Sequence, residues 1–275
     1  MNERLRKGLL IGATSILALA GAQLGVRVVS RRFLYRGRGT LAVATPADAR
    51  EHIVVAADGI TVHTLELFAG ARAPVLVHFH GNRETTADGV PFARSLRARG
   101  VGVVLVEYRG YGASLDSEPT EEGLYLDAEA VLGDLARRSI DRSRVLLSGA
   151  SLGTGVAAEM ARRGRGSALV LLMPYTSIPD LVRDHAPLVP ARQLLPDTFD
   201  TLAKAPQIAV PTLVVHGDHD AIVPHWMGAT IAQALPEGRF LSIAGGHHHD
   251  LLERASSSIL DAIVALTRVL PRKSL

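Results

Sequence analysis

The residues best suited to chemistry in this chain are a serine, two aspartates and a run of histidines that stand beside glycines. Gly149-Ala150-Ser151-Leu152-Gly153 follows the apolar stretch 145–148 and opens a segment with helical character. A G-x-S-x-G sequence between a strand and a helix is typical of a nucleophile elbow, a sharp strained turn that needs small flanking residues. The positive end of the following helix adds favourable potential. Ser151 is therefore the candidate nucleophile, against the alternative of a structural Gly/Ser turn.

A serine hydroxyl attacks only when a base takes its proton and a third group orients that base. The elbow predicts the order serine, acid, histidine along the chain. Asp218 and Asp220 both follow the apolar stretch 212–216, so either can be the acid. The alternative is that both carboxylates cap the helix expected to begin near Pro224.

The base is expected in the loop after the last strand. Residues 245–251 of this loop contain three consecutive histidines, His247, His248 and His249. The register of the His-x-Asp-Leu ending favours His248 as the base, with His247 next.

Two backbone N–H groups are needed to hold the oxyanion of a tetrahedral intermediate. The N–H of Leu152, directly after the nucleophile, is one candidate. The N–H of Asn82 is the other, because Gly81 allows the backbone to turn inward after the stretch 75–79. We interpret the neighbouring His80 as a packed loop histidine and Arg109 as a residue that braces loops through ion pairs.

The elements that must position these residues alternate along the chain. Strand-like runs at 52–56 and 61–68 flank an Asp58-Gly59 turn and predict a hairpin. Further strands are expected at 75–79, 101–106, 145–148, 168–173, 212–216 and 240–243, with helices at 90–99, 120–138, 152–163, 224–235 and 251–270. This alternation predicts an α/β fold with a mostly parallel sheet and helices on both faces. The proline-rich stretch 174–211 breaks the rhythm and is interpreted as a small cap-like insertion.

Taken together, the motifs resemble the α/β-hydrolase superfamily in its serine aminopeptidase-like branch, and more narrowly membrane-anchored proteins related to lipid and protein-acyl hydrolases. They run in family order across roughly residues 50–270. The matching pieces are His80-Gly81-Asn82, Tyr108-Arg109-Gly110-Tyr111-Gly112, Gly149-Ala150-Ser151-Leu152-Gly153, Pro174-Tyr175-Thr176-Ser177, His216-Gly217-x-x-Asp220-x-x-Val223-Pro224 and His248-x-Asp250-Leu251. The resemblance implies that Ser151, Asp220 and His248 are the nucleophile, orienting acid and base.

Two departures from the family pattern matter. His247 stands where a glycine usually precedes the catalytic histidine, which keeps the choice between His247 and His248 open. The loop after Asn82 continues Arg83-Glu84-Thr85 where related proteins often have small residues. This change is expected to alter the mouth of the pocket.

Composition excludes several classes of function. The 275 residues include no cysteine, so thiolate nucleophiles, disulfides and iron–sulfur clusters are ruled out. The first 38 residues carry eight basic residues and one acidic residue, whereas the rest of the chain has 22 basic and 26 acidic residues. The body therefore lacks the basic surplus of a nucleic-acid-binding protein.

Residues 1–38 have the pattern of a membrane anchor or a signal peptide with basic flanks. Gly8 to Val26 are 19 consecutive uncharged residues, close to the ~20 needed to span the hydrocarbon core. Small residues around Ala20 would also fit a signal-peptide cleavage site, which would make the protein secreted. We expect a single-pass N-terminal anchor followed by one catalytic domain, residues 39–275. A short linker is expected at 36–50.

The chain is thus predicted to be a serine hydrolase that cleaves an acyl ester, thioester or amide through an acyl-enzyme and needs no metal or cofactor. The membrane segment and the apolar insertion favour a lipid-like or acylated substrate. One alternative is a non-catalytic binding protein of the same fold. Another is a metal hydrolase that uses His78 and His80 or the His247–Asp250 cluster, which leaves the elbow at Ser151 unexplained.

Overall fold

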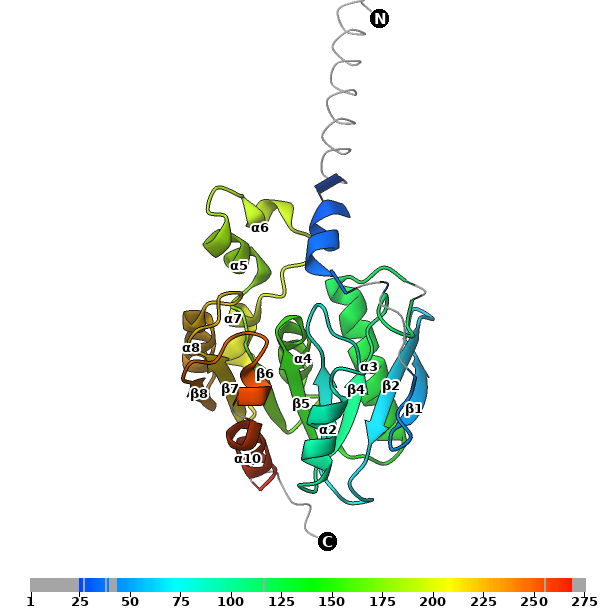
Figure 1. Cartoon of the computed structure of the whole chain (residues 1–275). Helices are drawn as coiled ribbons and strands as arrows, with labels where there is room; N and C mark the ends of the chain where they lie inside the picture. The colour runs from blue at the N-terminus through cyan, green and yellow to red at the C-terminus, as the bar shows by residue number, and fades with distance from the viewer. Residues whose placement is uncertain are drawn as a thin grey trace, which may run out of the picture.

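The computed structural model describes residues 25–268, apart from 27, 38, 40–43, 116 and 255. In this part of the chain one sheet of eight strands runs in the order β1-β2-β4-β3-β5-β6-β7-β8 (Figure 1). Its strands are β1 (Arg50–Val55), β2 (Thr61–Leu67), β3 (Val75–Phe79), β4 (Gly102–Val106), β5 (Val145–Ala150), β6 (Ala168–Leu172), β7 (Thr212–Gly217) and β8 (Gly238–Ile243).

The pairing of the strands follows their sequences. β1 and β2 form the predicted antiparallel hairpin, with Gly59 at φ +86° in its turn, and β2 also pairs antiparallel with β4. The remaining pairs are parallel. Strands β3 to β6 are buried on both faces, which explains their nearly continuous runs of Val and Leu.

Helices cover both faces of the sheet, as predicted. They are α2 (Val90–Arg97), α3 (Glu121–Arg137), α4 (Leu152–Arg162), α5 (Ile178–His185), α6 (Ala191–Leu194), α7 (Thr201–Lys204), α8 (His225–Ala234), α9 (Leu251–Arg254) and α10 (Ser256–Thr267). Within β3, Val77 joins the core cluster of α3, α4 and α8, whereas Leu76 joins that of α2 and α10. Because side chains alternate along a strand, these clusters lie on opposite faces of the sheet.

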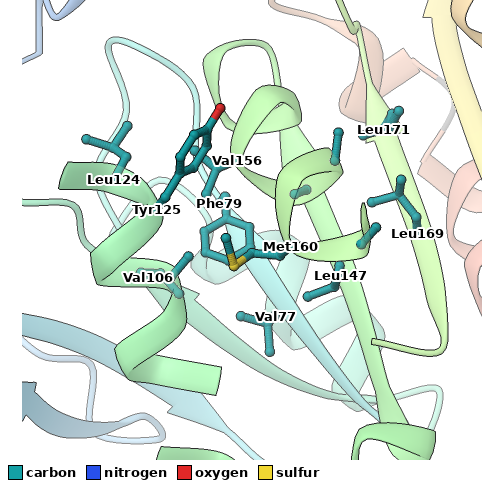
Figure 2. Packing of buried hydrophobic residues seen from close by; sticks show 14 of the residues in the cluster. Val77, Phe79, Val106, Leu124, Tyr125, Leu147, Val156, Met160, Leu169 and Leu171 are labelled. Atoms are coloured by element: carbon teal, nitrogen blue, oxygen red, sulfur yellow. The ribbon is translucent and has the colours of Figure 1, made fainter. Parts of the chain in front are cut away.

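Helix α4 packs against the centre of the sheet and thereby fixes the residue that precedes it. Figure 2 shows Val156 and Met160 of this helix beside Phe79, Val77 and Leu147 of the central strands. All five side chains have no exposed surface. The N-terminus of α4, where Ser151 lies, is therefore anchored by the core.

The predicted insertion lies between β6 and β7 and contains α5, α6, α7 and a short 3₁₀ turn, Ala205–Gln207. Residues 28–34 are helical, and Figure 1 shows this N-terminal helix at the same end of the molecule as α5 and α6. The apolar run from Gly8 falls almost wholly outside the described residues. Among the helices that are described, none combines the length and apolar character needed to cross a bilayer.

Candidate active site

Ser151 lies on strained backbone between β5 and α4. Its φ is +47°, in the left-handed region that non-glycine residues seldom occupy, and its N–H donates to the carbonyl of Leu172 at 2.9 Å. A backbone conformation of this kind costs on the order of 1–3 kcal/mol and persists only where the surrounding structure enforces it. The strain identifies this turn as a candidate functional feature.

The two glycines of the motif allow the chain to pack tightly around this turn. A Cβ atom on Gly149 would overlap the carbonyl of Gly153, and a Cβ atom on Gly153 would overlap the carbonyl of Phe79 at the end of β3. Both positions therefore exclude any larger side chain. The G-x-S-x-G spacing is explained by backbone contact on each side of Ser151.

His248 lies between Ser151 and Asp220. Its Nε2 is 3.1 Å from Ser151 Oγ, and its Nδ1 donates to Asp220 Oδ2 at 2.7 Å. The Nδ1 of His247 instead faces the carbonyl of His219 at 3.0 Å. The three residues selected by the family resemblance thus form a continuous chain of hydrogen-bonding contacts.

Asp220 is held by the loop after β7. Its Oδ1 accepts the N–H groups of Ile222 and Val223, at 2.9 and 2.8 Å, and its side chain is fully buried. Burial raises the pKa of Asp220, but hydrogen bonds from His216 and His248 outweigh it and hold that pKa well below its usual value. Asp220 is therefore a carboxylate at neutral pH.

Asp218, the other candidate acid, serves the loop itself. Its Oδ1 lies 2.7 Å from His219 Nδ1 and accepts the N–H of Gly245 at 2.6 Å. Its side chain is 39% exposed. Asp218 makes none of the contacts that connect Asp220 to His248.

The two candidate oxyanion residues, Asn82 and Leu152, line the same cavity as Ser151. A hydrogen bond fixes the peptide between Gly81 and Asn82: His80 Nδ1 donates to the carbonyl of Gly81 at 2.8 Å. The N–H of Gly81 donates to Glu84 Oε2 at 2.7 Å. The loop that carries Asn82 therefore has a defined conformation. We call residues 80–84 the oxyanion loop.

Beneath this loop, His80 and Glu107 form a buried pair. His80 Nε2 lies 3.2 Å from Glu107 Oε1, and Glu107 Oε2 accepts the N–H and hydroxyl of Thr86. Burial lowers the pKa of His80, but the Glu107 carboxylate outweighs it and leaves that pKa raised. His80 is thus a packed loop histidine, as its place in the sequence indicates.

Arg109 braces loops, as expected. Its guanidinium bonds Asp127 and Asp58, with N···O distances of 2.6 Å to each. Both pairs lie away from the cavity beside Ser151, whose lining does not include Arg109. Arg109 therefore ties the loop after β4 to α3 and to the turn between β1 and β2.

The cavity beside Ser151 has a volume of about 410 Å³. Most of its wall is apolar. The charged side chains in it are Arg36 and two residues of the oxyanion loop, Arg83 and Glu84. Its lining is Phe33, Leu34, Arg36, Gly81, Asn82, Arg83, Glu84, Ser151, Leu152, Met173, Tyr175, Ile178, Leu181, Ile222, Val223, His248 and His249. The insertion contributes Tyr175, Ile178 and Leu181.

The residues proposed for a metal site have other partners. His78 is buried in β3 with its Nδ1 3.1 Å from Ser148 Oγ, and burial lowers its pKa to about 3. Across the described residues, no group of three or more His, Asp or Glu side chains is arranged to hold a metal ion.

The sequence interpretation missed one part of the site. Residues 36–50 were expected to form a linker, but Gly37 is buried against Asn82 and Tyr111, and Phe33, Leu34 and Arg36 line the cavity. Tyr35, an aromatic residue two positions before Gly37, was the available signal for a packed turn.

The fold and the clustered motifs define the class of α/β hydrolases. A family model described as serine aminopeptidase, S33, matches residues 70–199, and one described as TAP-like protein matches residues 195–268. The chain belongs to the α/β-hydrolase superfamily.

Curated relatives agree with this membership. An uncharacterised protein of Mycobacterium tuberculosis strain H37Rv is 30% identical over 274 residues, which are 96% of each chain. A zebrafish (Danio rerio) protein named lysophosphatidylserine lipase ABHD12 is 29% identical over 67% of this chain and 52% of its own length. Together with the family models, these relatives support a hydrolase.

Among solved structures, the esterase Pf2001 of Pyrococcus furiosus matches with a TM-score of 0.70. The match covers 83% of this chain and 96% of the esterase at 16% identity. At this level of identity, the match shows only that the two proteins share the same fold.

Proposed function

We propose that the protein is a serine hydrolase in which Ser151, His248 and Asp220 form the catalytic triad. The observation that carries the proposal is the unbroken chain of contacts from Ser151 Oγ through the imidazole of His248 to Asp220 Oδ2. An ionised acid, an imidazole and a strained serine in this order are the parts that nucleophilic acyl transfer requires.

In the proposed reaction, Ser151 Oγ attacks an acyl carbonyl while His248 Nε2 takes the hydroxyl proton. Asp220 keeps the Nδ1–H tautomer and stabilises the imidazolium that forms. The N–H groups of Leu152 and Asn82 bind the oxyanion of the tetrahedral intermediate. The leaving group departs with the proton from His248, and water then hydrolyses the acyl-enzyme through the same base.

The cavity favours a substrate with an apolar acyl chain. Leu34, Met173, Ile178 and Leu181 supply apolar surface beside Ser151, within a cavity of about 410 Å³. The named activity of the zebrafish relative, a lysophosphatidylserine lipase, is in keeping with this class. We propose lipid-derived or acylated molecules as substrates, with esters of increasing acyl length as the first panel.

The membrane tether predicted from the N-terminal apolar run stays a prediction. Alkaline carbonate extraction of the full chain tests it. A tethered protein stays with the membrane pellet, whereas release into the supernatant at the full-length mass contradicts the tether.

A fluorophosphonate probe tests the proposed nucleophile. We expect covalent labelling of the wild type, complete loss in Ser151→Ala, and unchanged labelling after treatment with a chelator. Ser95→Ala, on the exposed face of α2, is the matched control and should label normally. Labelling that persists in folded Ser151→Ala, or a folded wild type that does not label, would contradict the proposal and favour a non-catalytic binding role.

A further inference from the structure

Residues 31–37, here called the N-terminal segment, are bound to the body of the protein at several points. Arg31 pairs with Asp197 of the insertion at 2.8 Å, and the Tyr35 side chain has no exposed surface. Asp197 also accepts the N–H of Glu121 at the start of α3. The segment is therefore part of the packed domain, at the end of the molecule where α5 and α6 lie (Figure 1).

The segment holds Asn82 directly. The N–H of Arg36 donates to Asn82 Oδ1 at 2.6 Å, and the N–H of Gly37 donates to the Asn82 carbonyl at 2.9 Å. The hydroxyl of Tyr111 adds a longer bond to Asn82 Oδ1, at 3.3 Å. Two consecutive backbone N–H groups thus bind both the side chain and the main chain of the candidate oxyanion residue.

The fit at Gly37 depends on the absence of a side chain. A Cβ atom there would lie 2.5 Å from the Asn82 carbonyl oxygen and 2.7 Å from Tyr111 Cε1. Gly37 is not among the residues with positive φ. The φ of residue 37 is therefore open to alanine, and what excludes a Cβ atom is the close approach of Asn82 and Tyr111, with Arg83 Cα at 3.2 Å.

We infer that Arg36 and Gly37 are positioning residues for the oxyanion hole, and that the N-terminal segment sets the direction of the Asn82 N–H. His80 binds the carbonyl of the Gly81–Asn82 peptide, and Glu84 binds the N–H of the preceding peptide. The N-terminal segment binds the side chain and the carbonyl of Asn82. A donor aimed at a developing charge helps only if it is held in place before the reaction. This inference rests on the proposed serine-hydrolase function.

The test is Gly37→Ala in the full chain, with hydrolysis of an acyl ester measured over a range of concentrations. The added methyl group pushes the segment and Asn82 apart, so the Asn82 N–H loses its alignment. We expect kcat to fall by about tenfold or more, approaching the loss of an oxyanion donor, while KM changes by less than about threefold. Gly70→Ala is the matched control, because a Cβ atom at Gly70 meets no atom within 4 Å, and it should behave as wild type.

Asn82→Ala provides the second arm, because it removes the bonded side chain but keeps the backbone N–H. We expect the same fall in kcat, and we expect the double variant with Gly37→Ala to lose less than the product of the two single effects. If Gly37→Ala does not fold, Asn82→Ala decides the matter by itself. Folded variants with wild-type kcat overturn the inference.

The two proposals fail in distinguishable ways. If wild type hydrolyses the ester and Ser151→Ala does not, the serine-hydrolase function stands whatever Gly37→Ala does. Unchanged kcat in folded Gly37→Ala then refutes only the positioning role. If Ser151→Ala retains full activity, the proposed function fails, and the inference drawn from it fails as well.

Discussion

Asp220 shows how one residue's surroundings determine what it can do. Two backbone N–H groups bind one carboxylate oxygen, and His248 binds the other. His216 Nε2 lies 3.4 Å from that second oxygen. This environment stabilises the charged form despite full burial. The carboxylate can therefore orient His248 without taking up a proton.

We expect Asp220→Asn to reduce kcat by about 10⁴-fold, because an amide cannot hold the Nδ1–H tautomer of His248. Ester hydrolysis at saturating substrate is the measurement. Asp218→Asn is the control, since the Asp218 carboxylate contacts His219 in its own loop and Gly245 in the loop after β8, but neither Asp220 nor His248 among the contacts described. It should stay within about threefold of wild type. Equal losses in the two variants would assign the effect to the loop rather than to the proposed triad.

At this scale the sequence identifies residue types better than it identifies partners. A short sequence pattern identifies Ser151, because the glycines on either side of it are required by close backbone contacts at the turn. His247 and His248 are adjacent and chemically identical, so only the backbone path after β8 decides which ring faces Ser151. The register of the His-x-Asp-Leu ending favours His248, but the path itself depends on strand pairing between distant segments.

At the scale of elements, the β5–α4 unit combines strain with close packing. Ser151 at φ +47° is held between a strand buried at every residue and a helix that packs onto β3. The contact of Gly153 with the Phe79 carbonyl lets α4 begin directly above the sheet. The turn is therefore stable only while α4 keeps this close approach.

Gly153→Ala should destabilise the protein by more than about 3 kcal/mol, because the methyl group would overlap backbone that cannot move aside. Urea unfolding followed by circular dichroism measures this. In Gly133→Ala the new methyl group on α3 meets only Arg137, at 3.6 Å, and we expect no loss of stability or a small gain from helix propensity. A Gly153→Ala protein as stable as wild type would show that α4 can shift.

Most elements were predictable because their patterns are local. The hairpin at Gly59, the buried strands and the Thr120 cap, which accepts the N–H of Gly123 at 2.9 Å, all appear where the sequence indicates. The predicted C-terminal helix corresponds to α9 and α10, and its last residues lie outside the described part. The order of strands across the sheet depends on contacts between distant segments. The alternation of strands and helices therefore predicts the α/β fold class but not that order.

At the scale of the whole molecule, Tyr35 ties the N-terminal segment to the core. Its ring has no exposed surface, and its hydroxyl has no hydrogen-bond partner among the described residues. A buried hydroxyl without a partner stabilises nothing, so the ring itself provides the attachment. An aromatic residue beside glycines indicates a packed turn, but the sequence could not show where the ring packs, because its partners come from segments far along the chain.

Tyr35→Ala should lower the free energy of unfolding by about 3–5 kcal/mol, as expected for removing a buried aromatic ring. Tyr35→Phe keeps the ring and should be neutral within about 1 kcal/mol, or slightly stabilising. Urea denaturation of both variants provides the comparison. A large loss in Tyr35→Phe would indicate a hidden partner for the hydroxyl, and a small loss in Tyr35→Ala would show that the segment is not anchored by this ring.

The pairing of Arg31 with Asp197 has a consequence for folding during synthesis. The two residues are 166 positions apart. At about 5–20 residues per second, the ribosome delivers Asp197 roughly 10–30 s after Arg31. Asn82 arrives earlier and His248 later. Arg31 is thus synthesised well before its partner Asp197, and the proposed triad cannot form before His248 has been added as well.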